Sequence, residues 1–172
     1  YFGEEIGECG MDEEGFSGRD GRTTIFDWWS VASIRRLRKL IASGKYRSSS
    51  VSELVENGLM KEEAELFLRF TEAVRFAAED CSIRQGTTYD LCYCNMSSDG
   101  FDKNRHFVFL RDYEEHTLLI AANFSNREAV MKLVIPEHAF EWMGIPKTEA
   151  LHPGKVIEVK VQPMDGAIVT LI

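Results

Sequence analysis

The sequence predicts an α+β protein with a helical N-terminal half and an antiparallel β-sandwich as its C-terminal domain. Apolar residues recur every three or four positions before Gly86 and close to every second position after it. After Gly86, short apolar runs alternate with turn clusters at spacings of about 8 to 15 residues, which is typical of a sandwich of about six or seven strands. We therefore divide the chain into residues 1–85 and residues 86–172.

Residues 1–26 are rich in glycine and in acidic residues. Closely spaced glycines disfavour regular secondary structure, so this stretch predicts a long loop. Aromatic side chains lie in the loop or directly after it and favour a loop that is anchored to the rest of the protein; they are Phe16, Phe26, Trp28 and Trp29.

Three helices are expected in the N-terminal half. The first begins at Asp27 or Ser30, either of which can cap it. The second covers Ser52–Asn57 and the third covers Lys61–Asp80. Glutamates of the third helix, Glu63 among them, are expected on its solvent face. The expected buried stripes consist of Val31, Ile34, Leu37 and Ile41 in the first helix and of Leu66, Phe67, Phe70, Val74 and Ala77 in the third.

The composition is that of a soluble globular protein, with 44% hydrophobic and 28% charged residues among 172. The net charge of −8 argues against nucleic acid as a partner, because phosphate binding needs clustered positive charge. The apolar runs are far shorter than the roughly 20 residues of a membrane helix, so no membrane partner is expected. The chain begins with tyrosine and not with methionine, so we expect a piece of a longer protein, and the lack of a signal-peptide pattern does not indicate where that protein is located. Its compartment stays open, with the cytoplasm slightly favoured.

The four cysteines are predicted to be buried free thiols. Cys9 and Cys81 are isolated, whereas Cys92 and Cys94 stand two apart in an expected strand, where both would point to one face. A disulfide or a metal site stays open as an alternative. The spacing lacks the two close pairs, or the pair with histidines, that zinc sites use, so no metal site is predicted.

Catalytic and cofactor motifs are not recognisable in the sequence. The histidines are scattered, and we expect each to be structural or exposed; they are His106, His116, His138 and His152. No Ser-His-Asp or Cys-His arrangement stands out. No phosphate-binding or dinucleotide fingerprint occurs either, so no cofactor is predicted.

Several weak motifs in the right order resemble the end of the α-amylase family, glycoside hydrolase family 13. They are an eighth barrel strand at Tyr1–Gly7 (Y-x-G-x-E-I-G), a final barrel helix within Ala64–Gly86, the bridge R-x-G-x-x-Y-D-L at Arg84–Leu91, the paired strands at Phe107–Arg111 and Thr117–Ser125, and a closing strand pattern from Gly154 to Ile168. The resemblance implies that residues 1–85 are the remnant of a (β/α)8 barrel, and that residues 86–172 are the C-terminal β domain of that family.

The resemblance also implies an activity for the parent protein. Family members cleave α-linked glucans with retention, by a nucleophilic carboxylate and an acid about 5 Å apart. Those groups project from the fourth, fifth and seventh barrel strands, and this chain begins at the eighth. We therefore expect the C-terminal region of an α-amylase-like glycosidase, with no catalytic residue in the chain, which would be inactive alone. The open alternatives are a glucanotransferase or isomerising enzyme of the same family, and a non-catalytic carbohydrate-binding module.

The loop after the expected eighth strand carries the candidate substrate-binding residues, which are Arg19, Asp20, Arg22 and Trp28. Barrel active sites are built from the loops at the carboxyl ends of the strands, so this loop would border the pocket of the whole enzyme. The alternative is that Asp20 and Arg22 brace the loop as an ion pair, while the tryptophan packs beneath it. Residues 18–29 and the helix after them depart from the usual family pattern, which leaves the sugar specificity open.

The expected partners follow from the same resemblance. They are an α-glucan or oligosaccharide bound by the full-length enzyme, the N-terminal barrel of the same protein, and further copies of the chain recruited through the exposed barrel remnant. A lone strand at Tyr1–Ile6 lacks neighbours, so we expect it to be exposed or rearranged, and the first two dozen residues to be held loosely. We expect residues 45–172 to fold. A carbohydrate-binding module would need exposed aromatic residues in a row, and Phe140 beside Trp142 predicts that this tryptophan packs inside.

Overall fold

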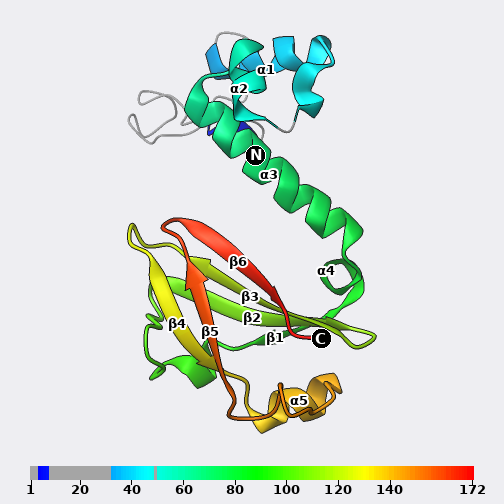
Figure 1. Cartoon of the computed structure of the whole chain (residues 1–172), viewed down its shortest axis with the longest axis vertical. Helices are drawn as coiled ribbons and strands as arrows, with labels where there is room; N and C mark the ends of the chain where they lie inside the picture. Colours follow the sequence, from blue (N-terminus) through cyan, green and yellow to red (C-terminus); the bar gives the residue numbers. More distant parts are fainter. Residues whose placement is uncertain (1–3, 8–31, 49) are drawn as a thin grey trace, which may run out of the picture. The chain divides into compact units, whose positions relative to one another are not determined.

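The computed structural model describes residues 4–7, 32–48 and 50–172 (Figure 1). Helices and antiparallel sheets both occur, so the α+β class predicted from the sequence is confirmed. The chain divides into two compact units, Tyr1–Phe76 and Ala77–Ile172. We call them the helical unit and the β unit.

Within its described residues, the helical unit contains two short 3-10 helices, η1 (Glu4–Ile6) and η2 (Lys45–Arg47), and three α-helices. These are α1 (Ala32–Ala42), α2 (Val51–Glu56) and the beginning of α3 (Lys61–Glu79). Ser50 caps α2, since its side chain accepts a hydrogen bond from the amide of Glu53. The predicted second and third helices are thus confirmed within one or two residues.

The core of the helical unit differs from the two predicted stripes. Its buried members are Ile6, Ile34, Leu37, Leu40, Leu54, Leu59 and Ala64, with Tyr46, Val51, Phe67 and Leu68 partly buried against them. Ile41 was expected inside but is 50% exposed, because Leu40 occupies the third core position of α1. On α3, Ala64 and Phe67 face the core, so Leu66, Phe70 and Val74 lie on another side and are exposed.

The expected eighth barrel strand is wrong for Glu4–Ile6, which form a 3-10 helix. A β-strand needs a neighbour for its backbone hydrogen bonds, and the described part of the helical unit contains no strand. Ile6 is buried among the helices rather than loosely held. Gly7 lies in a turn, and residues 1–3 lie outside the described ranges.

An ion pair between α1 and α3 sits at the edge of this core. The Arg36 guanidinium donates two hydrogen bonds to the Glu63 carboxylate, at 2.5 and 2.9 Å, and that carboxylate also accepts the amide of Met60 at 2.9 Å. Glu63 is therefore buried, contrary to the solvent face predicted for it. The periodicity of α3 could not reveal a partner on another helix.

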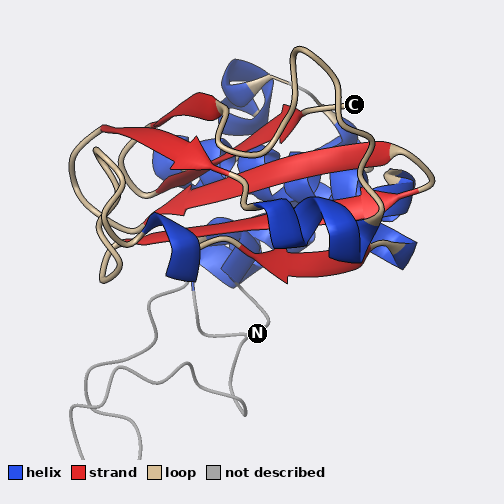
Figure 2. Cartoon of the chain, turned by 90° about the horizontal axis from the view of Figure 1, so that it is seen from below, coloured by secondary structure: helices blue, strands red, loops and turns tan. Residues whose placement is uncertain are grey.

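The β unit opens with the short helix α4 (Cys81–Gln85) and contains six strands, all within its described residues. Strands β1 (Thr87–Asp90), β2 (His106–Tyr113), β3 (His116–Asn123) and β6 (Asp165–Thr170) form one antiparallel sheet in the order β1-β2-β3-β6. Strands β4 (Ala129–Val134) and β5 (Val156–Val161) form a second antiparallel sheet. The strands are drawn red in Figure 2.

Both sheets bury their inner faces in one core. Val108 and Leu119 come from the four-stranded sheet, and Met131 and Val159 come from the two-stranded sheet. Alternation of buried and exposed residues along β4 is what a strand with one covered face requires. The period of two predicted strands in this half of the chain, and the structure shows which face of each strand is buried.

Two segments after Gly86 are helical where the sequence predicted strand or no helix. Cys92 and Cys94, expected on one face of a strand, lie in and beside a 3-10 helix, η3 (Tyr93–Asn95). The seven-residue helix α5 (Glu137–Met143) follows β4. The expectation that everything after Gly86 is β structure is therefore wrong at these two places.

Two buried asparagines, one at the end of β3 and one in η3, bind opposite ends of the β4–β5 pair. At one end, the Asn123 amide donates to the carbonyls of Arg127, Val161 and Gln162, at 2.7, 3.3 and 3.1 Å. At the other end, Asn95 donates to the Val134 carbonyl at 3.0 Å and accepts the Val134 amide at 2.9 Å. Both side chains are almost fully buried.

Gly86 marks a close approach of backbone at the entry to β1. A Cβ atom there would lie 2.2 Å from the Ser82 carbonyl oxygen and 2.7 Å from that of Asp112. Arg111 crosses the same junction and donates to the carbonyls of Ser82 and Ile83, at 2.8 and 2.5 Å. These bonds satisfy carbonyl groups near the end of α4 and hold it against β2.

We expect Glu63→Gln to lower the free energy of unfolding of the helical unit by about 1–2 kcal/mol at pH 7. The hydrogen bond from Arg36 lowers the pKa of Glu63, against the opposing effect of burial. Its stabilisation is therefore present above the unfolded glutamate value of about 4.3 and is lost as the pH falls through the lower folded value. Thermal unfolding followed at 222 nm, at pH 7 and at pH 3, measures this difference. Glu62→Gln, at an exposed neighbour, should change little at either pH.

We expect Asn123→Ala to lower the free energy of unfolding of the β unit by about 2–3 kcal/mol, because carbonyl groups at the end of β5 lose their donor. Urea titration followed by the amide resonances of β3 measures it. Asn126→Ala changes an exposed asparagine three residues away and is the matched control. Equal stability of the two variants would contradict the role assigned to Asn123.

Candidate functional site

The candidate substrate-binding residues from the sequence, Arg19, Asp20, Arg22 and Trp28, lie outside the described residues. Their role stays a prediction. The site that the structure offers instead lies in the β unit, beside the edge strand β1.

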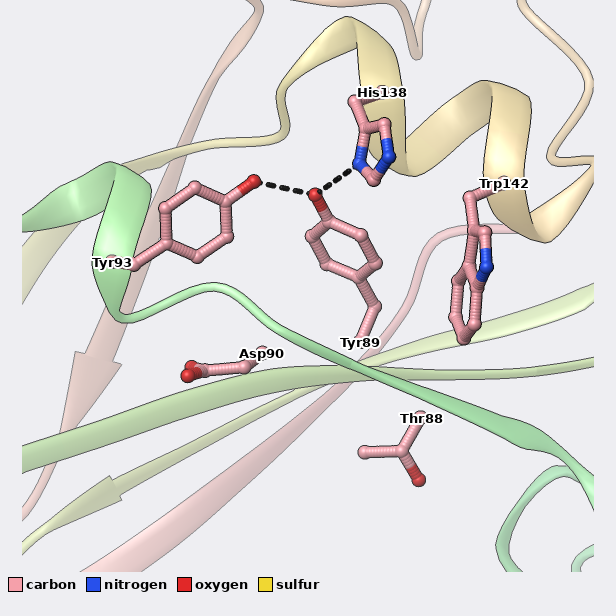
Figure 3. Close-up of a pocket in the computed structure, with 6 residues that line it drawn as sticks. All are labelled: Thr88, Tyr89, Asp90, Tyr93, His138 and Trp142. Atoms are coloured by element: carbon pink, nitrogen blue, oxygen red, sulfur yellow. Dashed lines mark hydrogen bonds between the residues drawn. The ribbon is translucent and has the colours of Figure 1, made fainter.

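This site is a surface pocket of about 330 Å³ between β1, η3 and α5, shown in Figure 3. We call it the β1–α5 pocket, and its lining residues are Thr88, Tyr89, Asp90, Tyr93, His138 and Trp142. Its volume is at the lower end of the range for small-molecule sites, about 300–1,000 Å³. Tyr89 is buried, and the other five lining residues are exposed.

Helix α5 provides one wall of the β1–α5 pocket. Pro136 precedes its first residue, and Gly144 ends it in the left-handed conformation at φ 71°. Phe140 is buried in the core of the β unit and fixes the rotation of the helix. His138 and Trp142 are four residues apart, so they lie on one face, and both point into the pocket (Figure 3).

Tyr89 forms the centre of the pocket. It is 8% exposed, and its hydroxyl lies 2.5 Å from the Tyr93 hydroxyl and 2.9 Å from Nδ1 of His138. Each of these two hydrogen bonds contains one proton. Either Tyr93 donates to Tyr89 and Tyr89 donates to His138, or His138 donates to Tyr89 and Tyr89 donates to Tyr93. The three side chains thus form one hydrogen-bonded chain (Figure 3).

Three aromatic side chains form a row across the pocket. The ring of Tyr89 lies 5.8 Å from that of Trp142 and 6.2 Å from that of Tyr93, with interplanar angles of 52° and 53°. Tyr93 and Trp142 flank Tyr89 on opposite sides (Figure 3). The outer two rings are 51% and 55% exposed, which leaves an aromatic surface open to solvent.

The electrostatics favour binding over proton transfer at Tyr89. Burial, and then the hydrogen bond to Tyr93, raise the pKa of Tyr89 well above the ordinary tyrosine value, so its hydroxyl stays protonated. Asp90 accepts the amide of Cys92 at 2.7 Å and is exposed, so its carboxylate retains acceptor sites. Of the described residues, neither lysine nor arginine lines the pocket.

Arg111 reaches the rim of the pocket through Thr88, whose hydroxyl accepts one of its hydrogen bonds. The same guanidinium donates to two carbonyl groups of α4. It therefore acts in the junction between α4 and β1, and its donors are engaged there.

His116, His106 and the cysteines among the described residues have structural surroundings, whereas Cys9 lies outside the described residues. His116 pairs with Asp80 at 3.0 Å, and Nδ1 of His106 accepts the amide of Asp102 at 2.9 Å. Cys81, Cys92 and Cys94 are free and partly buried, and burial raises the pKa of both Cys92 and Cys94. Thiols of this kind are less reactive than exposed ones. No cluster of metal-ligating residues occurs among the described residues.

No family model and no curated protein matches the chain. Of the helices in the described part of the chain, none combines the length and the apolar character needed to span a bilayer.

The β1–α5 pocket was missed by the sequence reasoning. Trp142 was expected to pack beside Phe140, but only Phe140 is buried and Trp142 faces solvent. The available signal was the bracketing of residues 137–143 by Pro136 and Gly144, which indicates a short helix. On such a helix, neighbours in sequence point to different sides.

We expect Tyr89→Phe to lower the free energy of unfolding of the β unit by about 1 kcal/mol, because the hydroxyl between two partners is lost while the ring stays. Since the folded pKa of Tyr89 is raised, its contribution holds below about pH 10 and falls as the pH rises through the folded value. Urea titration at pH 8 measures the loss. Tyr113→Phe, at the far end of β2, is the control, and an equal loss there would contradict the assignment.

Proposed function

We propose that the chain is the C-terminal region of an α-amylase-like glycoside hydrolase acting on α-glucans, and that its second half is the β-sandwich domain of that family. In this proposal residues 1–85 belong to the end of the catalytic barrel. The bond-cleaving carboxylates belong to a part of the enzyme before Tyr1. The chain contributes the domain that covers one side of the barrel.

The observation that carries this proposal is the junction at Gly86. The family-like bridge from Arg84 to Leu91 leads from a helix directly into the edge strand of an antiparallel unit in which two sheets share one core. Gly86 in that bridge meets two carbonyl groups too closely for any side chain. The glycine of the R-x-G-x-x-Y-D-L motif is therefore required for a steric reason in this structure.

A second motif residue has a similar physical reason. Asn123, in the family-like segment Thr117–Ser125, ends β3 and donates to three carbonyl groups. An aspartate of the same shape lacks these donors. Two separate parts of the resemblance thus coincide with positions where the β unit needs that residue type.

The non-catalytic carbohydrate-binding module is the second candidate function. The observation that favours it is the pair of exposed rings of Tyr93 and Trp142 on either side of the buried Tyr89, because such a module needs exposed aromatic rings near one another. The two candidates differ in whether a longer protein containing this chain turns over an α-glucan.

The test is an assay of that longer protein and of the 172-residue chain on maltoheptaose, with the products followed by NMR. We expect the longer protein to release the α-anomer first, because two displacements retain configuration. The chain alone should show no turnover above background. Transfer products longer than the substrate would identify the glucanotransferase alternative.

Release of the β-anomer, or no action on any α-glucan, would contradict the proposal. Turnover by the chain alone at a comparable rate would contradict the placement of the carboxylates before Tyr1.

A further inference from the structure

We propose that the β1–α5 pocket is an accessory, non-catalytic binding site for one or two glucose units of an α-1,4-linked glucan. This inference rests on the proposed function for the identity of the sugar. The presence of a ligand site rests on the pocket alone.

The first argument is the exposure of Trp142. An indole that is 55% exposed on a helix with a well-buried neighbour is not needed for the core, which Phe140 fills. Its ring also contacts Tyr89, and its nitrogen is turned away from that tyrosine (Figure 3). The indole therefore presents apolar surface to solvent, together with a donor at its edge.

The second argument is the set of polar groups beside the rings. Nε2 of His138 has no hydrogen-bond partner among the described residues, since the link to Tyr89 uses Nδ1. The Tyr93 hydroxyl and the Asp90 carboxylate are exposed and can take further bonds. These groups are donors and acceptors within one pocket, as a ligand with several hydroxyl groups requires.

The third argument concerns charge. An anionic ligand would meet the Asp90 carboxylate, and the described lining contains no lysine or arginine to offset it. The chain as a whole carries a net charge of −8, which also disfavours anions. A neutral ligand suits this pocket better than a phosphate or a carboxylate.

The fourth argument separates a sugar from a quaternary ammonium ion. Cation cages place aromatic faces around a cation. Here neighbouring centroids are 5.8 and 6.2 Å apart, so the rings are in contact and leave no space between them. Rings arranged in this way make a platform. A pyranose has an apolar C–H face for such a platform and hydroxyl groups around its edge.

The geometry assigns a role to each group. Trp142 stacks on the sugar face, and His138 and Tyr93 exchange hydrogen bonds with its hydroxyl groups. Asp90 accepts from hydroxyl groups at the far end of the row. Tyr89 positions Tyr93 and His138 and supports Trp142 from below. No bond is made or broken at the site, and its effect is to hold a polymer close to the enzyme.

The test is a titration of the 172-residue chain with maltoheptaose, followed by the NMR resonances of the Trp142 indole and of α5. We expect fast exchange and a dissociation constant in the millimolar range, as is usual for a small open site. Trp142→Ala should weaken binding at least tenfold. Trp142→Phe should recover most of it, because a ring is restored.

Phe124→Ala is the matched control, since Phe124 is exposed near the end of β3 and away from the pocket residues. It should bind maltoheptaose as the unchanged chain does. His138→Ala should weaken binding about three- to tenfold, because one hydrogen-bonding group is lost. The circular dichroism of all variants should match that of the unchanged chain, because none of these side chains is in the core.

Three outcomes would overturn the inference. They are the absence of maltoheptaose binding, equal binding by the Trp142→Ala variant, and binding of cellohexaose or tetramethylammonium at Trp142 in place of maltoheptaose. If the longer protein still turns over an α-glucan in these cases, the proposed function stands and only the accessory site falls. If the site binds maltoheptaose while the longer protein is inactive, the accessory site stands and the proposed hydrolase falls.

Discussion

The position of the two-stranded sheet depends on two buried asparagine amides, because this sheet shares no ladder of backbone hydrogen bonds with the four-stranded sheet. Apolar burial draws the sheets together, but it is non-directional and does not fix one sheet against the other. Asn123 binds the β5 end of the two-stranded sheet, and Asn95 binds the end of β4. Because these contacts lie at opposite ends of the sheet, they prevent it from rotating over the core.

The same contacts determine where the pocket walls stand. Tyr93 and Asn95 belong to one turn of η3, so fixing the asparagine also fixes the tyrosine. Helix α5 begins three residues after Val134, the residue that Asn95 binds. Both walls of the β1–α5 pocket are therefore attached to a single interaction. The hydrogen bonds from Tyr93 through Tyr89 to His138 also link the two walls, η3 and α5, directly to each other.

The sequence was a good guide to elements whose own period decides their structure. Apolar periods predicted strands in the region of β2 to β6 and helices at α2 and α3, although the buried face of α3 differs from the predicted stripe. Local sequence patterns gave wrong predictions where a residue distant in the chain determines the burial or the conformation. Glu63 was expected in solvent, yet Arg36, 27 positions away, stabilises it inside. Cys92 and Cys94 alternate like strand residues, but the bonds of Asn95 favour a turn there. The pocket joins residues 49 positions apart in the chain, such as Tyr89 and His138, so only the fold brings them together.

The rotation of α5 is set by Phe140 in the core, and this has a consequence for how the surface on its other side behaves. His138 and Trp142 are exposed, but the helix that carries them is held in place by the packed core, so their positions are fixed. A ligand therefore binds a surface that is already ordered. Because no loop has to be ordered on binding, little conformational entropy is lost. Such a preorganised face binds and releases single units of its ligand rapidly, so a long polymer can shift along it while it stays close to the surface.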